Sequence, residues 1–139
     1  MALAMANVAY TAWNGVVFAA FGSKPADKPE WNGYITFLRR ETRARARSVI
    51  YSRGSVLESY QRRDLEAFMK SLGKDKRIAV VTPSTFVRGF TKALSLIEPA
   101  FRSFSPSDLE AAFEYLEIPP LSFLDAKAVF DDLCTQASG

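Results

Sequence analysis

The stretch Arg77-Ile-Ala-Val-Val-Thr-Pro-Ser84 decides the fold class of this chain of 139 residues. Its residues 78–81 are apolar without a break, which predicts a strand over 77–82 that is buried on both faces. Pro83 ends this strand, and Ser84 suits the N-cap of a following helix because its hydroxyl can accept a free backbone N–H. A buried strand that leads directly into a helix is typical of a parallel βα unit, so the sequence predicts an α/β domain.

The segments before residue 77 continue this alternation toward the N-terminus. Asn14-Gly15 predicts a hairpin turn between strands at 7–11 and 16–21, since both residues tolerate a positive φ. Further elements are expected to be a helix from Pro29 to the arginines 39, 40 and 43, a strand at 48–51 and a helix from Ser59 to Gly73. An antiparallel hairpin therefore precedes the βα units.

The segments after residue 84 supply two more helices and a last strand. A helix between Ser84 and Pro99 is expected to bury one apolar face. The residues of that face are Phe86, Phe90, Leu94 and Ile97. A strand at 100–104 and a helix that begins at Ser105-Pro106 come next. The tail 121–139 has a weak helical pattern, and its apolar side would pack either on its own domain or in a partner's groove.

Together these elements predict a mixed five-stranded sheet with an N-terminal β-hairpin, four helices and a C-terminal helical tail. We expect an N-terminal extension at 1–6, the α/β domain at 7–118 and the tail at 119–139. Right-handed crossovers would place the helices on one face of the sheet. The other face would then show the aromatic side chains of the hairpin, either exposed for a second copy or covered by the tail. Those side chains are Tyr10, Trp13 and Phe18.

Composition excludes several classes of function. The chain contains no histidine and one cysteine, Cys134, so imidazole metal ligands, histidine-activated nucleophiles and an internal disulfide are all excluded. The longest strictly apolar run, Val16–Phe21, is too short for a membrane span. Neither a secretory signal nor a glycine-rich phosphate loop is recognisable. We therefore expect a cytoplasmic protein that is not an enzyme and holds no metal or cofactor.

Charge is distributed unevenly along the chain. Residues 1–77 carry 14 basic and 7 acidic side chains, whereas residues 78–139 carry 4 and 8. With the exposed hairpin aromatics, this asymmetry predicts a homodimer held mainly by apolar contacts. The arginines at 39–47 have no stacking aromatics free beside them, which favours a solvated helix end over a nucleic-acid site. No specific nucleic-acid partner is expected.

Six short phrases in a fixed order resemble a known family. They are Trp31, Gly54, Gln61-Arg62, Ala79 to Thr82, Val87-Arg88-Gly89 and Phe104-Ser105-Pro106. Over about residues 7–118 the chain resembles the STAS-like fold of bacterial anti-sigma-factor antagonists, and more closely a bacterial group described as STAS-like and lipid-transfer-like. The resemblance implies regulation by protein–protein contact, in some members switched by phosphorylation of a serine at the start of the second helix. The Asp-Ser-Ser-Gly type motif of that switch is absent here, and Ser55 and Ser59 match it by position only.

The loops after the third and fourth strands form the candidate binding site. In parallel α/β sheets, ligands bind beyond the carboxyl ends of the strands, beside free helix N-termini. The candidate residues are Arg53, Gly54, Ser55, Ser59, Gln61, Arg62, Thr82, Ser84 and Arg88. A purely structural reading has Ser59 and Ser84 as helix caps and Gly54 as a turn. We expect a regulatory or adaptor module that binds a protein; the alternative is a small-ligand or lipid-binding domain with peripheral lipid contact.

Overall fold

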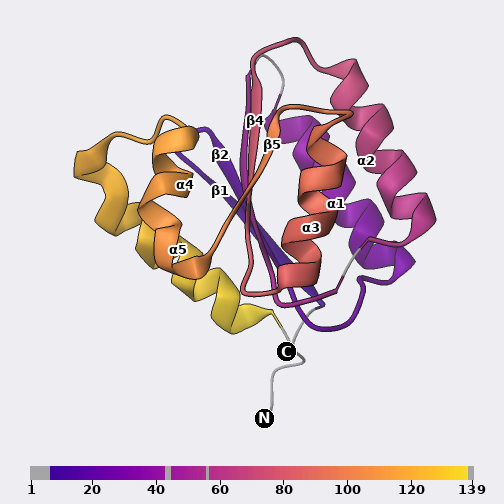
Figure 1. Ribbon diagram of the computed structural model, residues 1–139, viewed down its shortest axis with the longest axis horizontal. Helices are drawn as coiled ribbons and strands as arrows, with labels where there is room; N and C mark the ends of the chain where they lie inside the picture. Colours follow the sequence, from indigo (N-terminus) through magenta and orange to yellow (C-terminus); the bar gives the residue numbers. More distant parts are fainter. Residues whose placement is uncertain (1–6, 43–44, 56, 138–139) are drawn as a thin grey trace.

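The computed structural model describes residues 7–42, 45–55 and 57–137 and shows the predicted α/β fold. A five-stranded sheet lies between two layers of helices (Figure 1). Its strands are adjacent in chain order and comprise β1 (Val8–Trp13), β2 (Val16–Phe21), β3 (Ala46–Ser52), β4 (Lys76–Val81) and β5 (Phe101–Phe104). The predicted extension at 1–6, Arg43 and the end of the tail at 138–139 lie outside the described residues.

The five helices divide between the two faces of the sheet (Figure 1). They are α1 (Lys28–Glu41), α2 (Ser59–Ser71), α3 (Thr85–Ser95), α4 (Leu109–Tyr115) and α5 (Phe123–Gln136), with short 3-10 turns at Pro106–Asp108 and Pro120–Ser122. Helices α1, α2 and α3 share one face, as right-handed crossovers require. The expectation of a single helical face is wrong for α4, which follows the last strand and is therefore free to pass to the other face.

The N-terminal hairpin forms as predicted and sets the direction of the sheet. Asn14 and Gly15 have φ angles of 49° and 76° and join β1 to β2 as antiparallel neighbours. The pairs β2–β3, β3–β4 and β4–β5 are parallel. All six residues of β2 are buried, which agrees with the unbroken apolar run at 16–21 and with cover on both faces of this strand.

The first core layer lies between the sheet and α1, α2 and α3. Helix α1 begins with a capping box, in which Glu30 N donates to Asp27 Oδ1 over 2.9 Å and Asp27 N donates to Glu30 Oε1 over 3.0 Å. It places Trp31 and Tyr34 in the centre of this layer, both almost fully buried. Tyr10 packs here against Tyr34, with ring centroids 5.6 Å apart, and so does not lie on the face where we expected it.

The second core layer lies on the opposite face, beneath α4 and α5. Phe18 of β2 is fully buried against Phe113 of α4, and Phe130 of α5 meets the Tyr51 ring edge to face at 5.6 Å. The C-terminal tail thus packs on its own sheet, over β1 and β2. Of the two alternatives expected for this sheet face, exposure to a second copy or cover by the tail, the structure shows cover by the tail helix α5, together with α4.

A cluster of arginines fixes the C-terminal end of α4 to the sheet. The side chain of Arg47 is 4% exposed, and its guanidinium binds both Asp75 (Nη2 to Oδ1, 2.6 Å) and the carboxylate of Glu117. Arg45 contacts the same Glu117 carboxylate at 3.0 Å. Hydrogen bonds from Arg47 hold the pKa of Glu117 and of Asp75 below their ordinary values. These contacts hold Glu117 in a left-handed conformation (φ 64°) in the turn that follows α4.

Candidate functional site

The loops after β3 and β4 lie together, as predicted, but their polar groups bind one another. Ser52 Oγ donates to Ser55 O, and Ser55 Oγ donates to Gly22 O, each over 3.0 Å. Thr82 Oγ1 donates to Ser52 O over 2.7 Å, and the backbone N–H of Ser84 donates to Thr82 Oγ1 over 3.1 Å. Ser84 also caps α3 as predicted. These bonds join the ends of β2, β3 and β4 rather than facing an open cleft.

The remaining candidate residues are spread over three surfaces. Gln61 is buried and donates to Ala26 O over 2.9 Å, and it completes a capping box with Glu58. Glu58 is thus the N-cap of α2, so the suggested capping role of Ser59 is wrong. Of the other candidate residues, Arg53 contacts Cys134 O at 3.4 Å and Arg88 contacts Thr82 O at 3.5 Å. Gly54 is exposed, and Arg62 lies on the side of α2 nearest α3.

Helix α3 buries only part of the apolar face that we expected it to bury, because Phe90 and Leu94 are half-buried and Phe86 and Ile97 are exposed. Its buried residues are Val87 and Thr91, whereas Phe86 is 70% and Ile97 is 74% exposed. Apolar side chains at this helical spacing form a row along one side of α3 and the turn after it, which we name the α3 stripe; Phe90 in this row is half-buried. The α3 stripe consists of Phe86, Phe90, Ala93 and Ile97. The prediction of a core face was wrong because α3 packs at the edge of the sheet against β5, a strand of only four residues.

A groove with an apolar floor runs beside the α3 stripe, between α2 and α3. Its floor and walls are formed by Leu65, Met69, Leu94, Ile97 and Phe101. Charged side chains border it, namely Arg62, Glu66, Lys70 and Glu98. We call this feature the α2–α3 groove. Together with the α3 stripe it gives the first face of the molecule a connected apolar surface with a charged border.

A small cavity continues from the groove into the first core layer. It has a volume of about 70 Å³ and shares Leu65, Leu94 and Phe101 with the groove. The rings of Trp31 and Tyr34 line it from α1. Trp31 Nε1 donates to Asp64 over 2.9 Å. Burial raises the pKa of Tyr34, and the side chains around the cavity are mostly apolar.

Among the described residues, the structure contains no group of acidic or cysteine side chains suited to a metal ion. The only cysteine of the chain, Cys134, is half-buried, and burial raises the pKa of its thiol to about 11. Such a thiol is almost entirely protonated at neutral pH and is a poor nucleophile. The described part of the chain thus contains neither a recognisable metal site nor an activated thiol.

One feature of the sequence indicates that α3 leaves some apolar side chains exposed. The apolar arc of α3 runs from Ala93 to Thr91 around the helix, about half of its circumference, which is more than a short edge strand can cover.

Comparison of the chain with protein-family models, with curated proteins and with solved structures gives no match. No helix in the described part of the chain is both long enough and apolar enough to cross a membrane.

Proposed function

We propose that this chain is a non-catalytic regulatory or adaptor module that binds another protein through the α3 stripe. The observation that carries the proposal is the exposure of Phe86 and Ile97 on one side of a helix, next to an apolar groove. Connected apolar patches with a polar border are typical of protein interfaces, and large side chains at their centre supply most of the binding energy. An amphipathic segment of a partner fits such a groove.

The resemblance to STAS-like regulators supports the same proposal. The sheet begins with an antiparallel hairpin and continues through βα units in consecutive strand order, which agrees with that fold. Ser59 is exposed in the first turn of α2, whereas the Ser55 hydroxyl is bonded to Gly22 O. Of the two serines, Ser59 is thus the one that a kinase would reach. The single cysteine of the chain agrees with a place in the cytoplasm.

The alternative is a small-ligand or lipid-binding domain, which the cavity beneath α2 and α3 supports. Its volume of about 70 Å³ is small beside the ~300 Å³ at which pockets for drug-sized ligands begin. An acyl chain would therefore have to widen the cavity by moving α2 away from α3. The α3 stripe needs no such change to bind a protein, and for this reason we favour the first function.

Capture of partners from the native host tests the proposal with a matched control. The variant Phe86→Glu/Ile97→Glu places charge in the α3 stripe, and Leu121→Glu/Leu124→Glu places the same charge on exposed leucines at the start of α5. We expect the wild-type chain and the α5 variant to retain the same partner and the α3 variant to lose it. Retention by the α3 variant, with its fold intact by circular dichroism, would refute the role of the α3 stripe.

Two further measurements separate the remaining possibilities. Mass spectrometry of the purified native protein would reveal a co-purified lipid if the alternative function holds. Light scattering tests the homodimer, which stays a prediction; its contact would have to use a surface other than the sheet face now covered by α4 and α5. A dimer that Phe86→Glu/Ile97→Glu dissociates would identify the partner as a second copy of this chain.

A further inference from the structure

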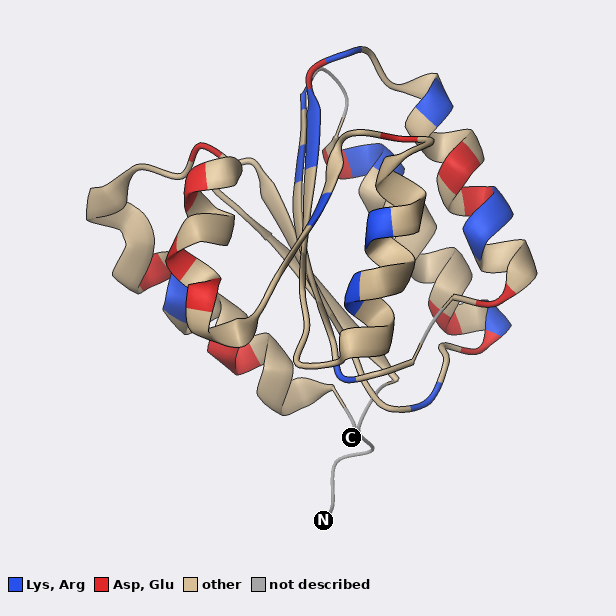
Figure 2. Ribbon diagram, in the orientation of Figure 1, with Lys and Arg blue, Asp and Glu red and all other residues tan. Residues whose placement is uncertain are grey.

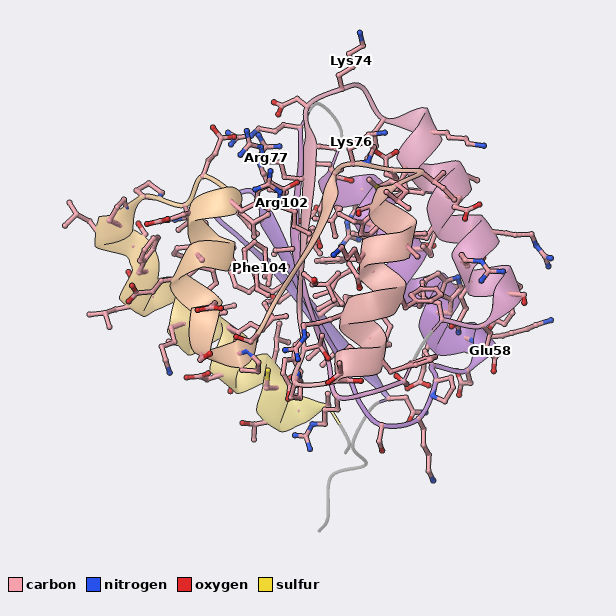
Figure 3. All side chains as sticks on the ribbon, viewed as in Figure 1. Glu58, Lys74, Lys76, Arg77, Arg102 and Phe104 are labelled. Atoms are coloured by element: carbon pink, nitrogen blue, oxygen red, sulfur yellow. The ribbon has the colours of Figure 1, made fainter. Side chains whose placement is uncertain are left out.

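Basic side chains gather at the N-terminal ends of β3, β4 and β5 (Figure 2). A surface hollow of about 460 Å³ lies there, bordered by the turns before β4 and β5 and by the end of α4. Its charged and aromatic lining consists of Lys74, Lys76, Arg77, Glu98, Arg102 and Tyr115. Figure 3 shows Arg77 and Arg102 beside each other on the α4 side of the sheet. We name this hollow the Arg77–Arg102 site.

The ring of Tyr115 holds both arginines in place. The Cζ atoms of Arg77 and Arg102 lie 5.2 and 4.7 Å from the centroid of this ring, within the range of cation–π contacts. The Tyr115 hydroxyl donates to Ala100 O over 2.6 Å, and Arg77 Nη1 donates to Tyr115 O over 2.9 Å. The two guanidinium groups are therefore positioned before any ligand arrives.

The positive charge of the Arg77–Arg102 site is only partly neutralised. Lys76 Nζ pairs with Glu98 at 2.9 Å, and Arg77 Nε lies 4.0 Å from Glu117. Within the described residues, neither Arg102 nor Lys74 has an ion pair or a side-chain hydrogen bond. Two cations held on one ring repel each other, and an anion between them would relieve that repulsion.

We propose that the Arg77–Arg102 site binds a phosphate group, carried by a phosphorylated small molecule or by a lipid headgroup. The planar fork of a guanidinium presents paired N–H donors that match two phosphate oxygens, and the exposed Arg102 has its donors available. The volume of about 460 Å³ falls within the range of ligand pockets, roughly 300–1,000 Å³. The site shares no residue with the α3 stripe, so the two proposals stand or fall separately.

Titration calorimetry with inorganic pyrophosphate tests the site in the full-length chain. Arg102→Gln removes the free guanidinium, and we expect its affinity for pyrophosphate to fall about tenfold or more, as for other charge-assisted hydrogen bonds. Tyr115→Leu should weaken binding too, because it removes the ring that positions both arginines. Tyr115→Phe keeps the ring and should bind like the wild-type chain. The matched control is Arg63→Gln, which removes one exposed positive charge from α2 outside the hollow.

A second arm identifies the source of the phosphate. Sedimentation with phosphatidylcholine vesicles, with and without phosphatidic acid, reports binding to a lipid headgroup. Binding of either pyrophosphate or the phosphatidic acid vesicles that Arg102→Gln weakens and Arg63→Gln preserves supports the site. The proposal is overturned if the wild-type chain binds neither probe, or if Arg63→Gln and Arg102→Gln weaken binding equally, since attraction would then follow net charge alone.

Discussion

Helices α3 and α5 are both amphipathic, but α5 buries more of its large apolar side chains than α3 does. Phe130 and Leu133 of α5 are 8% and 4% exposed beneath a helix that lies over β1 and β2. In α3, by contrast, the large side chain of Phe86 is 70% exposed. The difference arises from what lies below each helix, because α5 crosses the long hairpin strands and α3 packs beside the four residues of β5.

This difference assigns separate roles to two similar sequence patterns. The apolar side of α5 completes the second core layer and contributes to the free energy of folding. The α3 stripe adds little to that free energy, since most of its apolar surface stays in water. It is therefore available for a partner. Mutations on the two helices should separate stability from binding.

The largest effect is expected for Phe130→Ala in α5. Removing a buried phenylalanine side chain leaves a cavity and typically costs about 3–5 kcal/mol in the free energy of unfolding. Phe130 also loses its edge-to-face contact with Tyr51. Urea denaturation followed by circular dichroism measures the change. A loss below about 1 kcal/mol, as for an ordinary surface position, would show that α5 is not a structural part of the second core layer.

The next effect concerns Glu117, which joins α4 and its turn to the arginines of the sheet. Its pKa is lowered from an ordinary value near 4.5 by Arg47, so the ionised carboxylate stabilises the folded state at neutral pH. That contribution is present above about pH 4.5 and is lost as the pH falls through the folded pKa. We therefore expect Glu117→Gln to lower the free energy of unfolding at pH 7.

At pH 3 the same substitution should change stability less, because this pH lies below the ordinary pKa of 4.5 and protonation of the wild-type carboxylate then favours the unfolded chain. Urea denaturation of both chains at the two pH values measures the difference. A substitution that destabilises equally at pH 3 and pH 7 would mean that the shape of Glu117, rather than its charge, holds the turn.

The sequence predicted the order of elements and most of the core, because local signals determine both. Asn14-Gly15 encodes its turn through φ angles that few other residues adopt, and Trp31 and Tyr34 lie at the spacing of one helical face. The hydrogen bonds between the loops after β3 and β4 could not be predicted from the sequence. They join residues far apart in the chain, such as Ser55 and Gly22, and no periodicity reports them.

The side of the sheet taken by α4, and the exposure of α3, depend on tertiary contacts that the sequence pattern does not contain. Crossover handedness constrains a helix only when a parallel strand follows it, and none follows α4. The spacing of Phe86 and Phe90 is the same whether a long or a short strand lies below. The sequence pattern does not predict the Arg77–Arg102 site for a similar reason, because the Tyr115 ring contacts Arg77 and Arg102 only in the folded chain.

Phe86→Ala in α3 gives the counterpart to the substitution in α5. The side chain is mostly in water, and alanine favours the helical conformation, so we expect the free energy of unfolding to change by no more than about 0.5 kcal/mol. Urea denaturation under the conditions used for Phe130→Ala provides the comparison. A loss of about 2 kcal/mol or more would place Phe86 in the core and remove the basis for the α3 stripe.

The most direct report on the packing of α5, which leaves the free energy of unfolding unchanged, is the reactivity of Cys134. Burial raises the pKa of this thiol from an ordinary value near 9 to about 11, with Asp131 adding to the rise. A shift of about two pH units reduces the thiolate fraction near pH 8 by about a hundredfold, and iodoacetamide should react more slowly with the folded chain by a similar factor. In Phe130→Ala, opening of α5 should speed alkylation, whereas in Phe86→Ala the rate should match the wild-type chain. Alkylation of the folded wild-type chain at the rate of a free thiol would mean that the end of α5 does not stay packed beside Arg53.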